Sequence, residues 1–171
     1  MVFIDEMGSN ITLARHYGRA EPGVRIIDKI PGARGENVST LGALALDGMR
    51  QAVSLPGAVD GETFLFFIQQ VLAPTLRPGE IVLMDNIPTH KVGGVQEAIE
   101  AVGARLEYLP SYSPDLSPIE NFWSKVKTVL RRIGARTLAD LLVALHYAFN
   151  TVTLDDILGW FTHCGYKVAP N

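Results

Sequence analysis

The sequence LGALALDGMRQAVSL, residues 41–55, places an Asp-Gly pair between two apolar runs. Asp-Gly favours a two-residue hairpin turn, because the central residues of such a turn need positive φ. We therefore expect two antiparallel strands, at residues 41–46 and 49–55. An antiparallel pair so early in the chain interrupts the strict alternation of strand and helix that builds an all-parallel sheet. The stretch therefore predicts a mixed sheet.

The segments that flank this hairpin supply further elements. Residues 2–4 are a short apolar run that indicates a buried strand, and residues 81–84 are a second such run. Apolar side chains at helical spacing predict an amphipathic helix over residues 61–73. Residues 11–30 are interrupted by glycine and proline, and we expect edge strands or a hairpin there.

The C-terminal half returns to alternating elements. Its patterns predict, in order, a helix at residues 91–102, a strand at 106–109, a helix that begins at Ser117, and helices at 137–150 and 154–164. Three early antiparallel strands followed by alternating helix and strand give an α/β fold, a mixed sheet with helices on both faces. The ribonuclease H-like architecture has this order of elements.

The composition bounds the class of protein. A length of 171 residues with 47% hydrophobic content fits a single domain over residues 1–171. No apolar run can span a bilayer and no signal peptide is visible, so we expect a cytoplasmic protein without a membrane partner. The single cysteine, Cys164, excludes an internal disulfide and a multi-cysteine zinc site.

The charge balance restricts the kind of partner. The net charge of −3 is unusual for a free-standing DNA binder, which is normally basic. The chain therefore either does not bind nucleic acid or binds it locally, with another module supplying affinity.

Three carboxylates are candidates for a metal site. Asp5 and Asp85 follow apolar strands, and functional groups of α/β sheets collect near the carboxyl ends of strands. Each of them has a plain structural alternative, which is to cap the next turn. Glu120 follows Ser117 at the spacing of a capping box, which would also explain it. The first turn of a helix nevertheless favours an ionised carboxylate, which a hard divalent cation prefers.

Two segments then carry a family resemblance. Residues 85–91, DNIPTHK, and residues 109–123, LPSYSPDLSPIENFW, closely resemble the catalytic core of bacterial insertion-sequence transposases related to the mariner group. These proteins belong to the DDE superfamily, with an integrase-like, ribonuclease H-like fold. The family keeps a fixed spacing between its second Asp and its Glu, and the spacing from Asp85 to Glu120 is the same. Residues 3–8, FIDEMG, resemble the segment of its first Asp.

The resemblance implies a reaction and a set of roles. Asp5, Asp85 and Glu120 would be the catalytic triad and would bind two Mg²⁺ or Mn²⁺ ions. The expected reaction is cleavage of DNA phosphodiesters at the ends of a mobile element, followed by strand transfer into target DNA. Further family positions near the site, expected to support the triad or to contact DNA, are Asn86, His90 and Asn121.

The resemblance also implies partners. We expect element-end and target DNA, a homodimer or higher synaptic assembly, and a nucleoid-associated location. Family members usually carry a helix-turn-helix DNA-binding segment before the catalytic core. This sequence starts at the first catalytic strand, so we expect that segment to be absent from it or encoded elsewhere.

Residues beside the triad give a hypothesis for the path of DNA. Ser124, Lys127 and Arg131 share a helix face with Glu120, and the two cations are expected to contact phosphates. The simpler alternative is a solvated helix face. Tyr112 and Trp123 are candidates to stack on bases, although Trp123 fits core packing better.

Other functions stay open at this point. A receiver-type signalling domain phosphorylated on Asp85 would pair two acid positions after strands, but the early hairpin and the long gap between the acids disfavour it. A ribonuclease H-like nuclease or resolvase would keep the fold and change the reaction. A non-catalytic remnant is a third alternative. Asp115 competes with Glu120 as the third acid.

Overall fold

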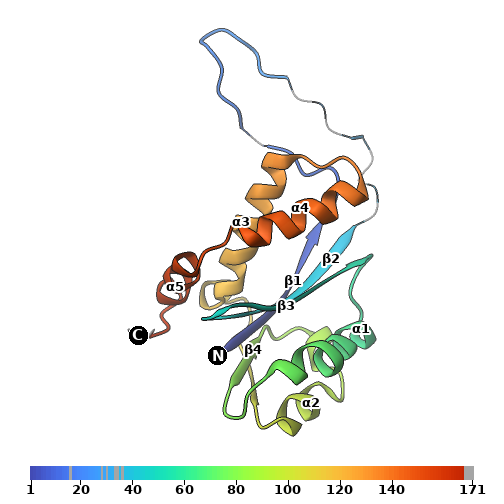
Figure 1. The fold of residues 1–171 in the computed structure, drawn as a ribbon, viewed down its shortest axis with the longest axis vertical. Coiled ribbons are helices and arrows are strands. Elements are labelled where there is room, and N and C mark those ends of the chain that lie inside the picture. Colours follow the sequence, from blue (N-terminus) through green and yellow to red (C-terminus); the bar gives the residue numbers. More distant parts are fainter. Residues whose placement is uncertain (16, 28, 30, 33–34, 36, 168–171) are drawn as a thin grey trace.

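The computed structural model describes residues 1–15, 17–27, 29, 31–32, 35 and 37–167. Within these ranges, the centre of the molecule is a five-stranded sheet with the order β3-β2-β1-β4-β5 (Figure 1). The strands are β1 (Val2–Ser9), β2 (Val38–Ala45), β3 (Gly48–Pro56), β4 (Ile81–Met84) and β5 (Arg105–Tyr108).

The sheet is mixed, as the hairpin predicts. β1 and β2 are antiparallel, and so are β2 and β3, whereas β4 pairs parallel to both β1 and β5. Gly48 takes a φ of 131° and already pairs with Ala45, so the turn lies one residue earlier than the Asp-Gly pattern predicts. The antiparallel β1–β2–β3 unit is incompatible with the strand–helix alternation of a receiver domain, and it excludes that hypothesis.

Helices follow the predicted order. They are α1 (Gly61–Phe66), a π-helical continuation η1 (Phe67–Leu72), the 3₁₀ turns η2 (Ala73–Thr75), η3 (Pro88–Lys91) and η4 (Pro114–Leu116), and α2 (Val95–Ala101), α3 (Pro118–Ile133), α4 (Leu138–Asn150) and α5 (Leu154–His163). The helix predicted over residues 91–102 begins later, because Gly94 has a φ of 96° and starts a new helix after η3.

Two cores lie on opposite faces of the sheet, which confirms the prediction of helices on both faces. Successive side chains of β1 alternate: Val2 and Ile4 pack with α1, η1 and α2, whereas Phe3 and Met7 pack with α3, α4 and α5 (Figure 1). The alternation fixes which residues of β1 face α3, and Asp5 shares that face with Phe3 and Met7.

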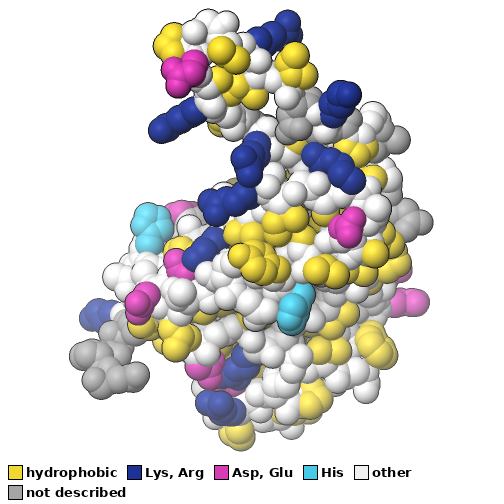
Figure 2. All heavy atoms as spheres, turned by 45° about the horizontal axis from the view of Figure 1, so that its top comes forward, with side chains coloured by type: hydrophobic (Ala, Val, Ile, Leu, Met, Phe, Trp, Pro, Cys, Tyr) yellow, Lys and Arg dark blue, Asp and Glu magenta, His cyan; other side chains and the backbone are white. Residues whose placement is uncertain are grey.

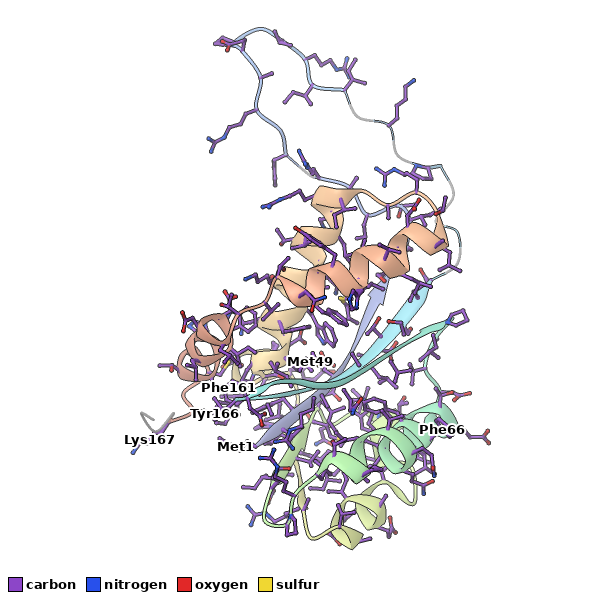
Figure 3. All side chains as sticks on the ribbon, in the orientation of Figure 1. Met1, Met49, Phe66, Phe161, Tyr166 and Lys167 are labelled. Carbon is purple, nitrogen blue, oxygen red and sulfur yellow. The ribbon has the colours of Figure 1, made fainter. Side chains whose placement is uncertain are left out.

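Aromatic contacts attach the last helix to the sheet. The ring of Phe3 meets Phe161 edge-on at 5.3 Å between centroids and Tyr166 at 5.1 Å. Figure 3 shows Phe161 and Tyr166 near one another close to the beginning of β1, whereas Phe66 points away from the sheet. α5 is therefore part of the core on the α3 face of the sheet.

The segment between β1 and β2 differs from the prediction. No described residue of 11–30 lies in a strand; residues 16, 28 and 30 fall outside the described part. This segment extends away from the sheet (Figure 1) and has no strand partner there. Its base is attached to the body by Arg136, whose Nη1 donates to the carbonyl oxygens of Ile11 and Leu13 at 3.1 Å.

Within the described ranges, no single helix is long and apolar enough to cross a membrane. Only α4 and α5 taken together reach the length and apolar composition of a membrane span, and the two helices are bent by 77° relative to each other.

Candidate active site

Asp5 lies in the middle of β1, whereas the sequence pattern predicted that the strand would end just before it. β1 continues to Ser9 because β2 goes on pairing with it, as far as the Ser9–Val38 pair. β4 ends at Met84, which pairs with Ile4, so Asp85 leaves the sheet beside Asp5. Two carboxylates that are far apart in the sequence thus come together where β4 ends.

A pocket of about 460 Å³ opens at this point. Asp5, Asp85 and Glu120 all line it, and they come from β1, the residue after β4, and the first turn of α3. The remaining lining residues are Ile4, Asn86, Ile87, Pro88, Leu109, Pro110, Ser111, Tyr112, Ser113, Pro114 and Ser117. Asp115, the rival third acid, is exposed and is not part of this lining.

The electrostatics of the pocket are dominated by Asp5. The pKa of Asp5 is raised from 3.8 to about 7, mainly by burial and further by the neighbouring carboxylates of Glu120 and Asp85. A hydrogen bond from the backbone of Glu6 and the nearby His90 act in the opposite direction. An anionic Asp5 is therefore costly here unless a cation joins the acids.

His90 contacts the Asp85 carboxylate on the side away from the pocket. Its side chain is buried, its ring stacks on Phe64 with centroids 4.3 Å apart, and its Nδ1 lies against Oδ1 of Asp85. The hydroxyl of Tyr108 donates to the backbone oxygen of His90 at 3.2 Å. The Asp85 side chain remains 48% exposed on its other side, towards the pocket. One carboxylate oxygen is thus fixed and the other is available.

Glu120 is not held by the predicted capping box. Ser117 is the N-cap of α3 and Pro118 occupies the first helical position, but the Ser117 side chain makes no capping hydrogen bond. Glu120 is exposed, and no hydrogen bond of its carboxylate is present among the described residues. A structural cap therefore does not account for this glutamate, and its carboxylate lies free at the edge of the pocket.

The other predicted site residues divide between two places. Asn86 is exposed on the pocket wall, whereas the Asn121 amide points away from it and donates to Sγ of Cys164 at 3.8 Å. Asn121 and Ser124 line a second, larger groove of about 1140 Å³ between α3, α4 and α5, which contains none of the three acids.

The cations of α3 and of the residues just after it have different surroundings. Lys125 forms an ion pair with Asp156, and Arg136 is engaged by backbone carbonyls. Lys127 and Arg131 are half-buried, and neither forms an ion pair within the part of the chain that the structure describes. On the face drawn in Figure 2, Lys and Arg side chains gather in the upper part of the molecule, above a hydrophobic area.

The pocket suits a hard cation by its chemistry. As the side chains stand, no group of three His, Cys, Asp or Glu residues in the described part is close enough to enclose one ion. The donors nevertheless are all carboxylate oxygens, and the pKa of Asp5 is raised by burial and by the neighbouring acids, so a bound cation would favour its charged form. Asp5, Asp85 and Glu120 therefore fit Mg²⁺ or Mn²⁺ better than a soft metal.

A comparison with protein families gives a match over most of the chain. The model that matches residues 1–141 describes the DDE superfamily endonucleases. The chain belongs to this family. The match includes Asp5, Asp85 and Glu120, and it confirms the resemblance of residues 85–91 and 109–123.

Solved structures with the same fold extend the comparison. The DDE endonuclease chain is similar to Mos1 transposase in a paired-end complex with the left transposon end (18% identity, TM-score 0.73, covering 95% of this chain and 51% of that one). It is also similar to the Mos1 strand transfer complex (17%, 0.73, 95% and 51%) and to the catalytic domain of Mos1 mariner transposase (14%, 0.67, 95% and 76%). The chain spans about half the length of the full Mos1 chains. Curated protein sequences give no significant match.

Sequence patterns did not identify one residue that shapes this DDE pocket. Gly42 pairs with Asp5 across the sheet, and Trp123 of α3 packs directly over it. A Cβ at position 42 would lie 2.6 Å from Cη2 of Trp123. The absent side chain lets α3 approach the sheet beside Asp5, one turn after Glu120. No local signal marks a glycine inside a strand as a contact for a helix much later in the chain.

Proposed function

We propose that this chain is the catalytic domain of a DNA transposase, which cleaves DNA at the ends of a mobile element and transfers the freed strand into target DNA. The proposal is carried by one observation: acids from β1, the end of β4 and the start of α3 line a single pocket. Membership of the DDE endonucleases and a fold shared with Mos1 transposase support it.

The three acids would hold two divalent cations. Asp5 would be one of their ligands together with Asp85 and Glu120, whose carboxylates lie near enough to raise its pKa. Such ions, when bound, activate the attacking water or 3′-hydroxyl and neutralise the leaving oxygen. Mos1 structures contain Mg or Mn, which supports the same choice of metal here.

Neighbouring residues would position the acids and the DNA. His90 orients Asp85 through the Nδ1 contact, and Asn86 meets the DNA at the exposed pocket wall. Lys127 and Arg131 would contact phosphates along α3. Asn121, which lies in the other groove, would support α5 through Cys164.

The partners follow from the same proposal. The Mos1 complexes contain paired transposon ends, and we extend DNA ends, target DNA and a synaptic dimer or larger assembly to this chain. A separate helix-turn-helix segment would supply sequence-specific binding, and the working location would be the nucleoid in the cytoplasm.

The test is metal-dependent DNA cleavage by the wild-type chain and by Asp85→Ala. We expect cleavage with Mg²⁺ or Mn²⁺, none with Ca²⁺, whose looser coordination does not hold an in-line displacement, and none with Asp85→Ala. Asp115→Ala is the matched control, since Asp115 is an exposed acid near the pocket that does not line it. Undiminished nicking by Asp85→Ala would overturn the proposal. Cleavage without strand transfer would indicate a nuclease of the same fold.

A further inference from the structure

Tyr112 has an unusual backbone at an unusual place. Its φ is 58°, and it is the one non-glycine residue with positive φ in the part of the chain that the structure describes. Its side chain is fully exposed, at 102% of the reference area. A large aromatic ring is thus held in solvent by a conformation that glycine adopts much more easily.

The chain on both sides of Tyr112 has restricted freedom. Pro110 and Pro114 each fix their own φ on either side of the turn, and the backbone N–H of Leu116 donates to the carbonyl of Ser113 at 3.1 Å. Among the described residues, Tyr112 makes no hydrogen bond or ring contact that would offset the energetic cost of its positive φ. Backbone strain of this kind persists at functional sites, where the benefit appears only with the ligand.

The position of the ring relative to the acids suggests the ligand. Tyr112 lines the same pocket as Asp5, Asp85 and Glu120. Ile87, which is 42% exposed, belongs to the same lining. The pocket thus combines three acids, which suit a cation-bound phosphate, with apolar surface and an open aromatic face. A nucleotide has both of these parts, an anionic phosphate and a flat base.

We propose that Tyr112 forms a nucleobase-binding subsite, in which its ring stacks on a base next to the phosphate held at the carboxylates. This inference rests on the proposed function, because it takes DNA as the substrate of the pocket. The base is unpaired or at a strand end, since a ring can stack on its face only when a neighbouring base is absent or displaced.

Stacking would also help DNA to bind despite the negative charge of the pocket. The chain carries a net charge of −3 and three acids at this pocket, so DNA is repelled there until cations bind. Contact between an uncharged ring and the face of a base attracts DNA without depending on that charge. It also tolerates any sequence, because every base presents a π-face.

The experiment uses the whole chain and a short synthetic duplex with an unpaired end that carries 2-aminopurine. Binding is measured in Ca²⁺, by anisotropy for affinity and by 2-aminopurine fluorescence for stacking. We expect quenching with the wild type and with Tyr112→Phe. Tyr112→Ala should abolish the quenching and weaken binding about 5- to 150-fold, the range for losing one base–aromatic stack.

Two controls separate stacking from damage to the fold. Tyr112→Gly removes the ring and relieves the positive φ, so its Tm should be no lower than that of the wild type while its DNA binding falls as in Tyr112→Ala. A duplex whose unpaired end is abasic should weaken binding by the wild type and leave binding by Tyr112→Ala unchanged.

The outcomes distinguish this subsite from the proposed function. If the wild type cleaves DNA in an Asp85-dependent manner while Tyr112→Ala keeps its affinity and its quenching, the subsite is wrong and the transposase proposal stands. If Tyr112-dependent quenching occurs but no metal-dependent cleavage does, the subsite stands as a DNA-binding feature and the catalytic proposal fails.

Discussion

At the residue scale, the Asp5 carboxyl combines burial with two like charges. Its pKa is about 7 in the folded protein and near 3.8 when unfolded, so the folded state binds the proton more tightly. The stability that this provides is present in full below pH 3.8 and is lost as the pH rises through about 7. We expect the metal-free protein to lose about 4 kcal/mol of unfolding free energy from this group between about pH 4 and pH 8.

The measurement is urea unfolding of metal-free protein across this pH range, compared with Asp5→Asn. The variant carries no titrating carboxyl at position 5, so its stability should depend less steeply on pH. The groups that face Asp5, namely Glu120, Asp85 and His90, are retained in both proteins. Parallel stability curves for the two proteins would contradict the raised pKa.

His90 gives a second prediction at this scale. Its Nδ1 meets Asp85 while its ring is fixed on Phe64, so it sets the direction of the Asp85 carboxylate. We expect His90→Leu to lower the affinity for Mn²⁺ about 10- to 100-fold, the range for groups that orient metal ligands. His90→Asn, whose amide can donate from a similar position, should retain more of the affinity.

Calorimetric titration with Mn²⁺ measures this without relying on cleavage. Phe64→Leu is the matched comparison, because it removes the stacking partner but retains the imidazole, so its loss of affinity should be smaller than that of His90→Leu. Unchanged affinity in His90→Leu would mean that the residue only fills space.

At the element scale, the approach of α3 to the sheet depends on Gly42. A Cβ at this position would stand 2.6 Å from Cη2 and 2.8 Å from Cζ2 of Trp123, so the Trp123 ring or the helix that carries it must shift. We expect Gly42→Ala to cost about 1–3 kcal/mol of stability, as overpacking does. Cleavage should also fall, because Glu120 lies one turn away on the same helix.

The matched control is Gly8→Ala on β1, where an added Cβ meets nothing within 4 Å. The compensating variant is Gly42→Ala with Trp123→Phe, since the smaller ring makes room for the methyl group. The double variant should recover part of the stability and of the cleavage rate relative to Gly42→Ala. If the stability changes of Gly42→Ala and Trp123→Phe simply add up in the double variant, the two residues do not interact.

At the scale of the whole molecule, a net charge of −3 would make the proposed DNA binding weak and local. If Lys127 and Arg131 each contact one phosphate, Lys127→Ala and Arg131→Ala should weaken binding equally for all sequences. Each should also make the salt dependence shallower by about one unit of log K per log salt.

Titrations of a duplex at several salt concentrations measure the slopes. Arg77→Ala is the control, because Arg77 is a 72% exposed cation that precedes the amino end of β4, whereas the pocket lies where β4 ends. Unchanged slopes for the Lys127 and Arg131 variants would leave them as an ordinary solvated helix face.

Local sequence determined most of the elements and named the candidate acids. The Asp-Gly turn, the apolar run at Ile81–Met84 and the stripe of α3 are short-range patterns, and the strands and helices that they predict are present. The spacing of Asp85 and Glu120 within a family motif made them candidates before any geometry was known, and the family comparison confirms the family to which the motif pointed.

Tertiary structure alone decided the arrangement of the site. β1 runs past Asp5 to Ser9 because β2 supplies hydrogen-bond partners there, and those partners lie much later in the chain. The capping box at Ser117 does not form, and Asn121 turns toward Cys164 just after α5. Strand length, side-chain direction and the Gly42–Trp123 approach all depend on contacts between distant segments. A local pattern cannot encode such contacts, because their energy arises only once the segments have packed together.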